Sequence, residues 1–191
     1  MKKLYSFVLL VLLAGSTAIA QSVDGIVQKY LSGNAEEVGL KTTDVAQWTV
    51  TDIVPSLNPE IQHVYVQQQY QGIPIQNGTY KLTVKNGQVT YEINQFIKDV
   101  ATKSAGAAAS LSPENAIQKV VQHHKMQAPR NLSATKSSGN TFEYANSGIS
   151  IEPIKVEKRY LSVGNKLHLT WNVSIYQLDA QHWWNVNVDA A

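Results

Sequence analysis

The pattern that most restricts the fold occurs twice: a short amphipathic helix is followed by segments in which apolar and polar residues alternate. The first helix is predicted at about residues 23–31. The second is predicted at about 112–126, where Ser112 is placed as the N-cap and Pro113 as the first helical residue. Alternation with a period of two is typical of strands with one buried face. The pattern therefore predicts an α+β fold of two small helix-plus-antiparallel-sheet domains.

The first half is predicted to form an antiparallel meander of strands from residue 63 onward. Asn86-Gly87 stands between two alternating segments. This dipeptide is a strong hairpin signal, because both central residues of a type I′ turn need a positive φ. A short helical turn is predicted before the strands, at 43–48, with Trp48 facing inward.

The second half is predicted to continue with strands at 141–144, 149–160, 166–178 and 183–188. The third is the clearest, because five apolar residues from Leu167 to Ile175 share one face. The same alternation places Trp171 and Trp184 on core-facing sides. Trp183 is predicted to face outward, which makes it a candidate for partner binding.

The boundaries of the predicted domains follow from a stretch of small residues at 102–111, which has few groups that could fill a core. We expect this stretch to be a linker. It would join a first domain at 21–101 to a second at 112–191.

The first 20 residues have the pattern of a secretory signal peptide. Lys2 and Lys3 precede an apolar run at 7–13, and Ala18-Ile19-Ala20 matches a cleavage site. The run is too short to cross about 30 Å of hydrocarbon, which takes about 20 residues. We therefore expect a secreted protein whose mature chain begins near residue 21.

The charge balance argues against a nucleic-acid-binding protein. The leader holds two of the 16 basic residues and none of the 14 acidic ones, so the mature chain carries 14 of each. Such a chain lacks the basic surface that neutralises phosphates. It also has no cysteine, which excludes disulfides and thiolate-bound zinc.

The residues that could carry catalysis are scattered. His123 and His124 are adjacent on a predicted helix and point about 100° apart, which is poor geometry for chelating one metal. The sequence contains no H-E-x-x-H pair, no G-x-S-x-G elbow and no phosphate-binding loop. We expect a chain that is not an enzyme and binds neither a metal nor a cofactor.

The most specific segment is 63–75, His-Val-Tyr-Val-Gln-Gln-Gln-Tyr-Gln-Gly-Ile-Pro-Ile. Gly72 permits a sharp bend, and Pro74 fixes φ and cannot donate to a strand ladder. Ile73 and Ile75 are expected to pin the bend to a core. The amide of Gln68 supplies both a donor and an acceptor that could tie the bend together.

This segment resembles the core of the fungalysin/thermolysin propeptide motif: a hydrophobic strand, a glutamine, an aromatic residue, then Gly-hydrophobic-Pro-hydrophobic. The motif positions are Gln68, Tyr70, Gly72, Ile73, Pro74 and Ile75. The flanks at 40–48, 167–171 and 182–190 are similar to the pro-regions of bacterial fungalysin-family zinc metalloprotease precursors. The second half is similar to PepSY domains, and the pair implies cystatin/PepSY-like folds.

The resemblance implies a propeptide that inhibits a secreted zinc metalloprotease and assists its folding, acting on the catalytic domain in cis or in trans. Zinc would belong to that protease domain alone. The chain stops at Ala191 before any H-E-x-x-H, so we expect either a truncated precursor or a stand-alone inhibitor. An exported PepSY-like ligand-binding or adhesion protein that uses the Trp183 region is the alternative. Neither function requires nucleic acid, or a membrane once the leader is removed.

Overall fold

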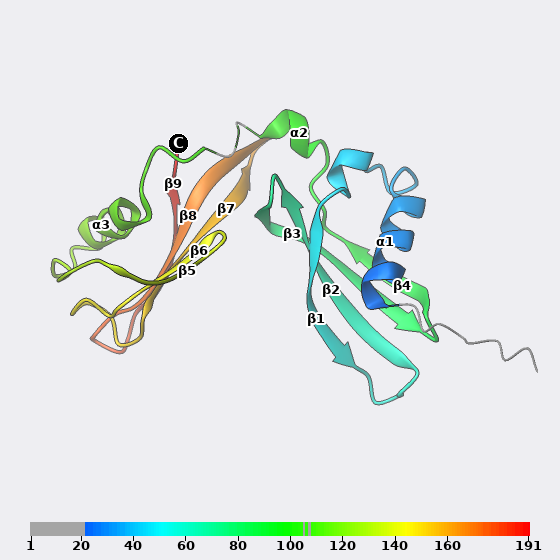
Figure 1. Ribbon diagram of the computed structural model, residues 1–191, viewed down its shortest axis with the longest axis horizontal. Coiled ribbons are helices and arrows are strands. Elements are labelled where there is room, and N and C mark those ends of the chain that lie inside the picture. The colour runs from blue at the N-terminus through cyan, green and yellow to red at the C-terminus, as the bar shows by residue number, and fades with distance from the viewer. Residues whose placement is uncertain (1–21, 105, 107) are drawn as a thin grey trace, which may run out of the picture.

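The computed structural model describes residues 22–104, 106 and 108–191, which form an α+β fold (Figure 1). The predicted leader lies outside these residues. The nine strands found in them are linked in one network. The strands pair antiparallel throughout, except for a parallel contact between β3 and β7. The chain forms two lobes, each with its own hydrophobic core. The N-terminal lobe contains β1–β4, and the C-terminal lobe contains β5–β9.

The N-terminal lobe packs one helix on a four-stranded sheet. Its elements are α1 (Val23–Asn34), the 3₁₀ helix η1 (Thr42–Asp44), β1 (Trp48–Pro55), β2 (Ile61–Tyr70), β3 (Ile73–Lys85) and β4 (Gln88–Asn94). The predicted first helix is confirmed. Ser22 caps it, because its Oγ accepts a hydrogen bond from the backbone N–H of Gly25 (3.2 Å). Val27 and Leu31 on its buried face pack against Val64, Leu82 and the rest of the N-terminal core.

The predicted Asn86-Gly87 hairpin is confirmed. The two residues connect β3 and β4 with φ of 50° and 76°, and Lys85 and Gln88 pair directly beside the turn. Local turn chemistry thus fixes the register of β4.

The helical turn predicted at 43–48 is wrong beyond Asp44, because Trp48 begins strand β1. The alternation of apolar and polar residues that would predict this strand is interrupted. A bulge between Val50 and Asp52 shifts the register against β2, so inward-facing positions no longer recur every second residue. Most of β1 is also exposed.

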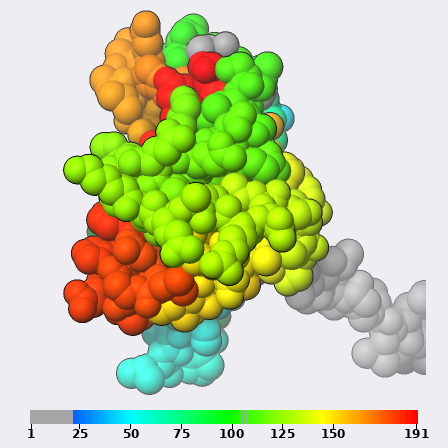
Figure 2. Space-filling model, turned by 90° about the vertical axis from the view of Figure 1, so that its left-hand side faces the viewer, coloured from blue at the N-terminus to red at the C-terminus, as the bar shows by residue number. Residues whose placement is uncertain are grey.

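The C-terminal lobe packs a second helix on a five-stranded sheet. Its elements are α3 (Pro113–His123), β5 (Ala134–Ser138), β6 (Thr141–Tyr144), β7 (Ile154–Val163), β8 (Lys166–Tyr176) and β9 (Trp183–Asp189). The Ser112 cap is confirmed, since its Oγ accepts from the backbone N–H of Asn115 (3.2 Å). Figure 2 shows the segment of α3 and the loop after it lying across the lobe.

The predicted bounds in the C-terminal lobe need several corrections, among them the ends of two strands: β7 extends to Val163 rather than 160, and β8 ends at Tyr176 rather than 178. α3 ends at His123 rather than 126, because Lys125 has a positive φ. β7 begins at Ile154 rather than 149, directly after Pro153. β5 gives no alternation from which to predict it, because all five of its residues are exposed.

The stretch 102–111 begins inside a helical turn, α2 (Val100–Lys103). Ser104 then forms a parallel bridge to Leu167 of β8. The backbone N–H groups of Ser110 and Leu111 both donate to the carbonyl of Ala190. No helix formed by the described residues is long and apolar enough to cross a membrane.

Candidate functional site at the junction of the lobes

The six motif residues lie where β2 turns into β3, at the junction of the two lobes (Figure 1). Gln71 and Gly72 form a two-residue turn with φ of 51° and 72°, and Tyr70 pairs with Ile73 across it. Gly72 supplies the positive φ at little steric cost. Its carbonyl accepts a hydrogen bond from Nδ2 of Asn140, in the turn between β5 and β6 (2.6 Å). The turn of one lobe is therefore held by a side chain of the other.

The apolar residues of the motif are buried in the C-terminal core, although β3 belongs to the N-terminal sheet. Ile73 and Ile75 belong to the same buried cluster as residues of β7, β8 and α3, and Ile75 forms the parallel bridge to Tyr160 of β7. The ring of Tyr70 lies against that of Tyr160, with centroids 6.1 Å apart. Side chains of the motif, which lies on strands of the N-terminal lobe, thus form part of the core of the C-terminal lobe.

Pro74 lies opposite Gln69 in the β2–β3 ladder and is partly buried. The next paired residue on β3 is Thr79, which lies opposite Gln67. Residues 75–78 therefore leave the ladder in a detour that reaches β7. Nε2 of Gln67 holds this detour, because it donates to the carbonyls of Ile75 (2.6 Å) and Gly78 (2.8 Å).

Gln68 is fully buried and joins three segments of the N-terminal lobe. Its Nε2 donates to the carbonyls of Asp44 and Ile97, both at 2.9 Å. Its Oε1 accepts from the backbone N–H of Ile97 at 2.7 Å. The amide therefore acts as both donor and acceptor, but its partners precede β1 and follow β4. The detour itself is held by Gln67.

Asp44 completes this buried polar network. Its carboxylate accepts three backbone N–H groups: Lys41 (2.9 Å), Asp99 (3.0 Å) and Val100 (2.9 Å). The first of these bonds caps η1, and the other two fix the start of α2. Together Asp44 and Gln68 position the connection that leads into the C-terminal lobe.

Gly78 provides a test of the packing around Gln68, because a side chain added at Gly78 would meet Gln68 and Ile75. An added Cβ would lie 2.8 Å from Oε1 of Gln68 and 3.2 Å from the Cβ of Ile75. We expect Gly78→Ala to lower the free energy of unfolding by about 1–3 kcal/mol, measured by urea denaturation. Gly33→Ala in α1 is the control. It should stabilise the chain or leave it unchanged, because an added Cβ there meets no described atom within 4 Å. Equal effects of the two substitutions would contradict the proposed close packing.

The tryptophans of the C-terminal sheet divide as the alternation predicts. Trp171 is buried, and Trp184 is half-buried against the C-terminal core. Trp183 is 62% exposed and lies on the opposite face. It is remote from the motif, so the structure does not bring together all the residues singled out in the sequence.

Two histidines stack on Trp184 near the end of α3, and a third contacts one of them. The ring of His124 stacks on the indole with centroids 3.7 Å apart, and His182 stacks at 5.2 Å. His123 contacts His124 edge-on, while Asp179 bonds Nδ1 of His182 at 2.6 Å. Burial lowers the pKa of His124, and the positive charges that His123 and His182 can carry lower it further.

This pKa shift predicts that stability falls with acidification. The folded state binds a proton at His124 less readily than the unfolded state, so the penalty grows as the pH falls below the unfolded pKa of about 6.5. We expect a smaller difference in unfolding free energy between pH 7 and pH 5 for His124→Gln than for the wild-type chain. His168→Gln, on β8, is the control. An unchanged difference in the His124 variant would show that the shift does not contribute.

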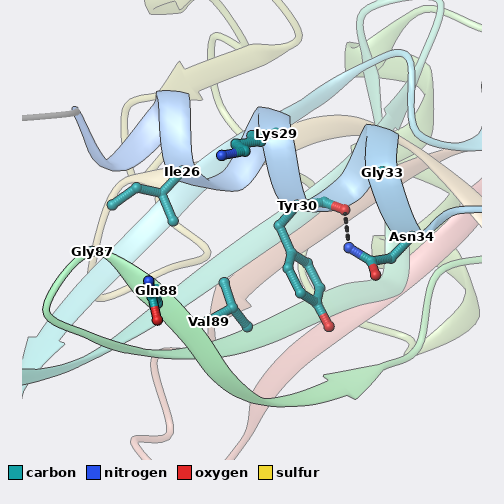
Figure 3. A pocket seen from close by; sticks show the side chains of 8 residues that line it. All are labelled: Ile26, Lys29, Tyr30, Gly33, Asn34, Gly87, Gln88 and Val89. Carbon is teal, nitrogen blue, oxygen red and sulfur yellow. Dashed lines mark hydrogen bonds between the residues drawn. The ribbon is translucent and has the colours of Figure 1, made fainter.

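A surface groove of about 390 Å³ lies between α1 and the β3–β4 hairpin. Figure 3 shows Ile26 and Tyr30 of α1 facing Val89 of β4 across it. The groove lies within the N-terminal lobe, and none of the six motif residues lines it. Among the described residues, no three His, Asp or Glu side chains gather in a metal-binding cluster.

A comparison with known protein families finds a match over the strands of the N-terminal sheet. No curated protein matches the sequence. Residues 46–96 match the family model described as the Fungalysin/Thermolysin Propeptide Motif. This range contains β1–β4 and every residue of the β2–β3 turn, so the resemblance read from 63–75 is confirmed. The match ends before α2 and does not include the PepSY-like resemblance of the second half. Residues 46–96 thus match the fungalysin/thermolysin propeptide motif.

Proposed function

We propose that this chain is the non-catalytic pro-region of a secreted zinc metalloprotease, which it inhibits and helps to fold. The observation that carries the proposal is the motif at 46–96, whose β2–β3 turn is built into the junction of the lobes. The partner would be the catalytic domain of a fungalysin-type protease, in cis in a longer precursor or in trans. The catalytic zinc would belong to that domain, and this chain would need no cofactor.

The two lobes are proposed to be two small cystatin/PepSY-like domains, at 21–101 and 112–191, with 102–111 between them. Each lobe packs one helix on an antiparallel sheet, which supports this division. The C-terminal lobe would be the PepSY-like one. Residues 1–20 are proposed to direct export and to be removed, which places the mature chain outside the cytoplasm.

The junction offers a physical basis for assisting folding. A pro-region promotes folding when it binds a native-like state of its partner more tightly than the unfolded chain. A preorganised surface binds more tightly, because less conformational freedom is lost on association. The buried side chains of Ile73 and Ile75, with the bond from Asn140 to Gly72, tie the two lobes together. Contacts made from both lobes could then act on the protease as one rigid surface.

Inhibition is tested by mixing the purified chain with the folded catalytic domain of a fungalysin-type protease and following cleavage of a fluorogenic peptide. We expect cleavage to slow in a saturable way. Ile75→Ala should weaken inhibition, whereas Gln69→Ala should not, because the Gln69 side chain makes no hydrogen bond to any described residue. Unchanged cleavage at saturating chain concentration would refute the inhibitory role.

A further inference from the structure

The face of the C-terminal sheet turned away from α3 carries neutral polar and aromatic side chains. Residues that alternate with the buried Val173 and Ile175 share this face. The ladder between β8 and β9 pairs Tyr176 with Trp183, Ser174 with Asn185, and Asn172 with Asn187. These six side chains define the β8–β9 face.

Trp183 is exposed but held in a fixed orientation. Its indole stacks on the ring of Tyr176, with centroids 5.2 Å apart and planes 17° from parallel. Its Nε1 donates to Oγ of Ser174 at 2.9 Å. A large aromatic ring that is both exposed and immobilised presents a flat apolar surface to solvent. Little side-chain entropy remains to be lost when a ligand packs against it.

The asparagines beside it form an ordered array of amides. Asn172 is buried, and its Nδ2 donates to Oδ1 of Asn185 (2.5 Å) and Oδ1 of Asn187 (3.1 Å). This arrangement turns the Nδ2 groups of Asn185 and Asn187 away from Asn172. Neither Nδ2 donates a hydrogen bond to any residue that the structure describes. Both are donors that a ligand could use.

A fixed indole beside outward-facing amides matches the chemistry of a sugar ring. One face of a pyranose carries C–H groups that pack on an aromatic ring, while its hydroxyls exchange hydrogen bonds with planar amides. We propose that the β8–β9 face is a binding platform for a neutral polysaccharide. The platform is a sheet surface without walls, which suits a polymer lying along it better than an enclosed small molecule.

The uncharged side chains of the face itself favour a neutral ligand. None of the six side chains is ionised near pH 7. On the neighbouring strand β7, Glu157 lies opposite Asn172 and is paired with Arg159 at 2.5 Å. Lys155 of β7, which lies opposite Ser174, is the exposed cation beside the face, so alginate is included in the test as the acidic ligand that this lysine would favour. This inference is independent of the proposed action on a protease.

The test is native affinity electrophoresis of the purified chain in gels that contain xylan, β-1,3-glucan, β-1,4-mannan or hydroxyethyl cellulose, with alginate as an acidic comparison. We expect at least one neutral polymer to retard the chain. Trp183→Ala should weaken that binding by about 10-fold or more, as truncation of a central aromatic contact commonly does. Asn185→Ala should weaken it by a smaller factor. Tyr91→Ala is the matched control, because Tyr91 of β4 is equally exposed at 62%.

Each outcome decides the proposal. Retardation that is lost with Trp183→Ala and kept with Tyr91→Ala supports it. The proposal is overturned if no neutral polymer retards the wild-type chain, if alginate alone does so, or if both variants bind equally. It is also overturned if Trp183→Ala weakens protease inhibition instead, since the face would then be a protein interface.

Discussion

Replacing Gln68 with alanine is expected to lower the free energy of unfolding by about 3–5 kcal/mol. The substitution removes three hydrogen bonds and leaves the carbonyl of Asp44 and both backbone groups of Ile97 without their partner. An unsatisfied buried polar group costs about 1–3 kcal/mol, and the vacated volume adds to the loss. Urea denaturation followed by circular dichroism measures the change.

Gln69→Ala is the matched control for this prediction. It removes the same side chain from the neighbouring residue, where the amide makes no hydrogen bond to the described part of the chain. We expect a change within about 0.5 kcal/mol. If both variants lost similar stability, the buried network of Gln68 would not be what supports the motif.

Replacing Ile75 with alanine is expected to destabilise the C-terminal lobe, although Ile75 lies on a strand of the N-terminal sheet. Its side chain is fully buried in the C-terminal core. Truncating a buried isoleucine costs about 2–5 kcal/mol, depending on how far the site can collapse. Hydrogen exchange of the α3 backbone amides reports on the lobe directly, and we expect their protection to fall.

The control for the second prediction is Ile53→Ala on β1, where the residue is 43% exposed and lies outside both cores. It should change stability by less than about 1 kcal/mol and leave the exchange of α3 unaffected. Undiminished protection of α3 in the Ile75 variant would show that the lobes are not coupled through the motif.

The features that the sequence predicts well are those that local chemistry determines. Asn86-Gly87 forms its turn because both residues tolerate a positive φ, and Ser112 caps α3 because its hydroxyl reaches the first turn. The strand β1 escapes prediction because a bulge at Val50 and Asp52 breaks its alternation. β5 escapes because both its faces are exposed.

The site is predictable only in part. Alternation at Ile73 and Ile75 indicates burial, but it cannot show which core receives them, since Tyr160 lies far along the chain. Gln67, Gln68 and Gln69 are identical in sequence, yet the detour of β3 gives each a different environment. The role of Asp44 depends on the start of α2, which the sequence pattern does not relate to it.

The most direct test of the central claim is the refolding yield of a denatured fungalysin-type catalytic domain, with zinc present, measured as recovered peptidase activity with and without an equimolar amount of this chain. Recovered activity is read after dilution or dissociation of the chain, so that inhibition does not mask folding. The account predicts a higher yield with the wild-type chain and with Gln69→Ala, and a smaller gain with Ile75→Ala. An identical yield with and without the wild-type chain, together with unchanged peptide cleavage, would contradict it.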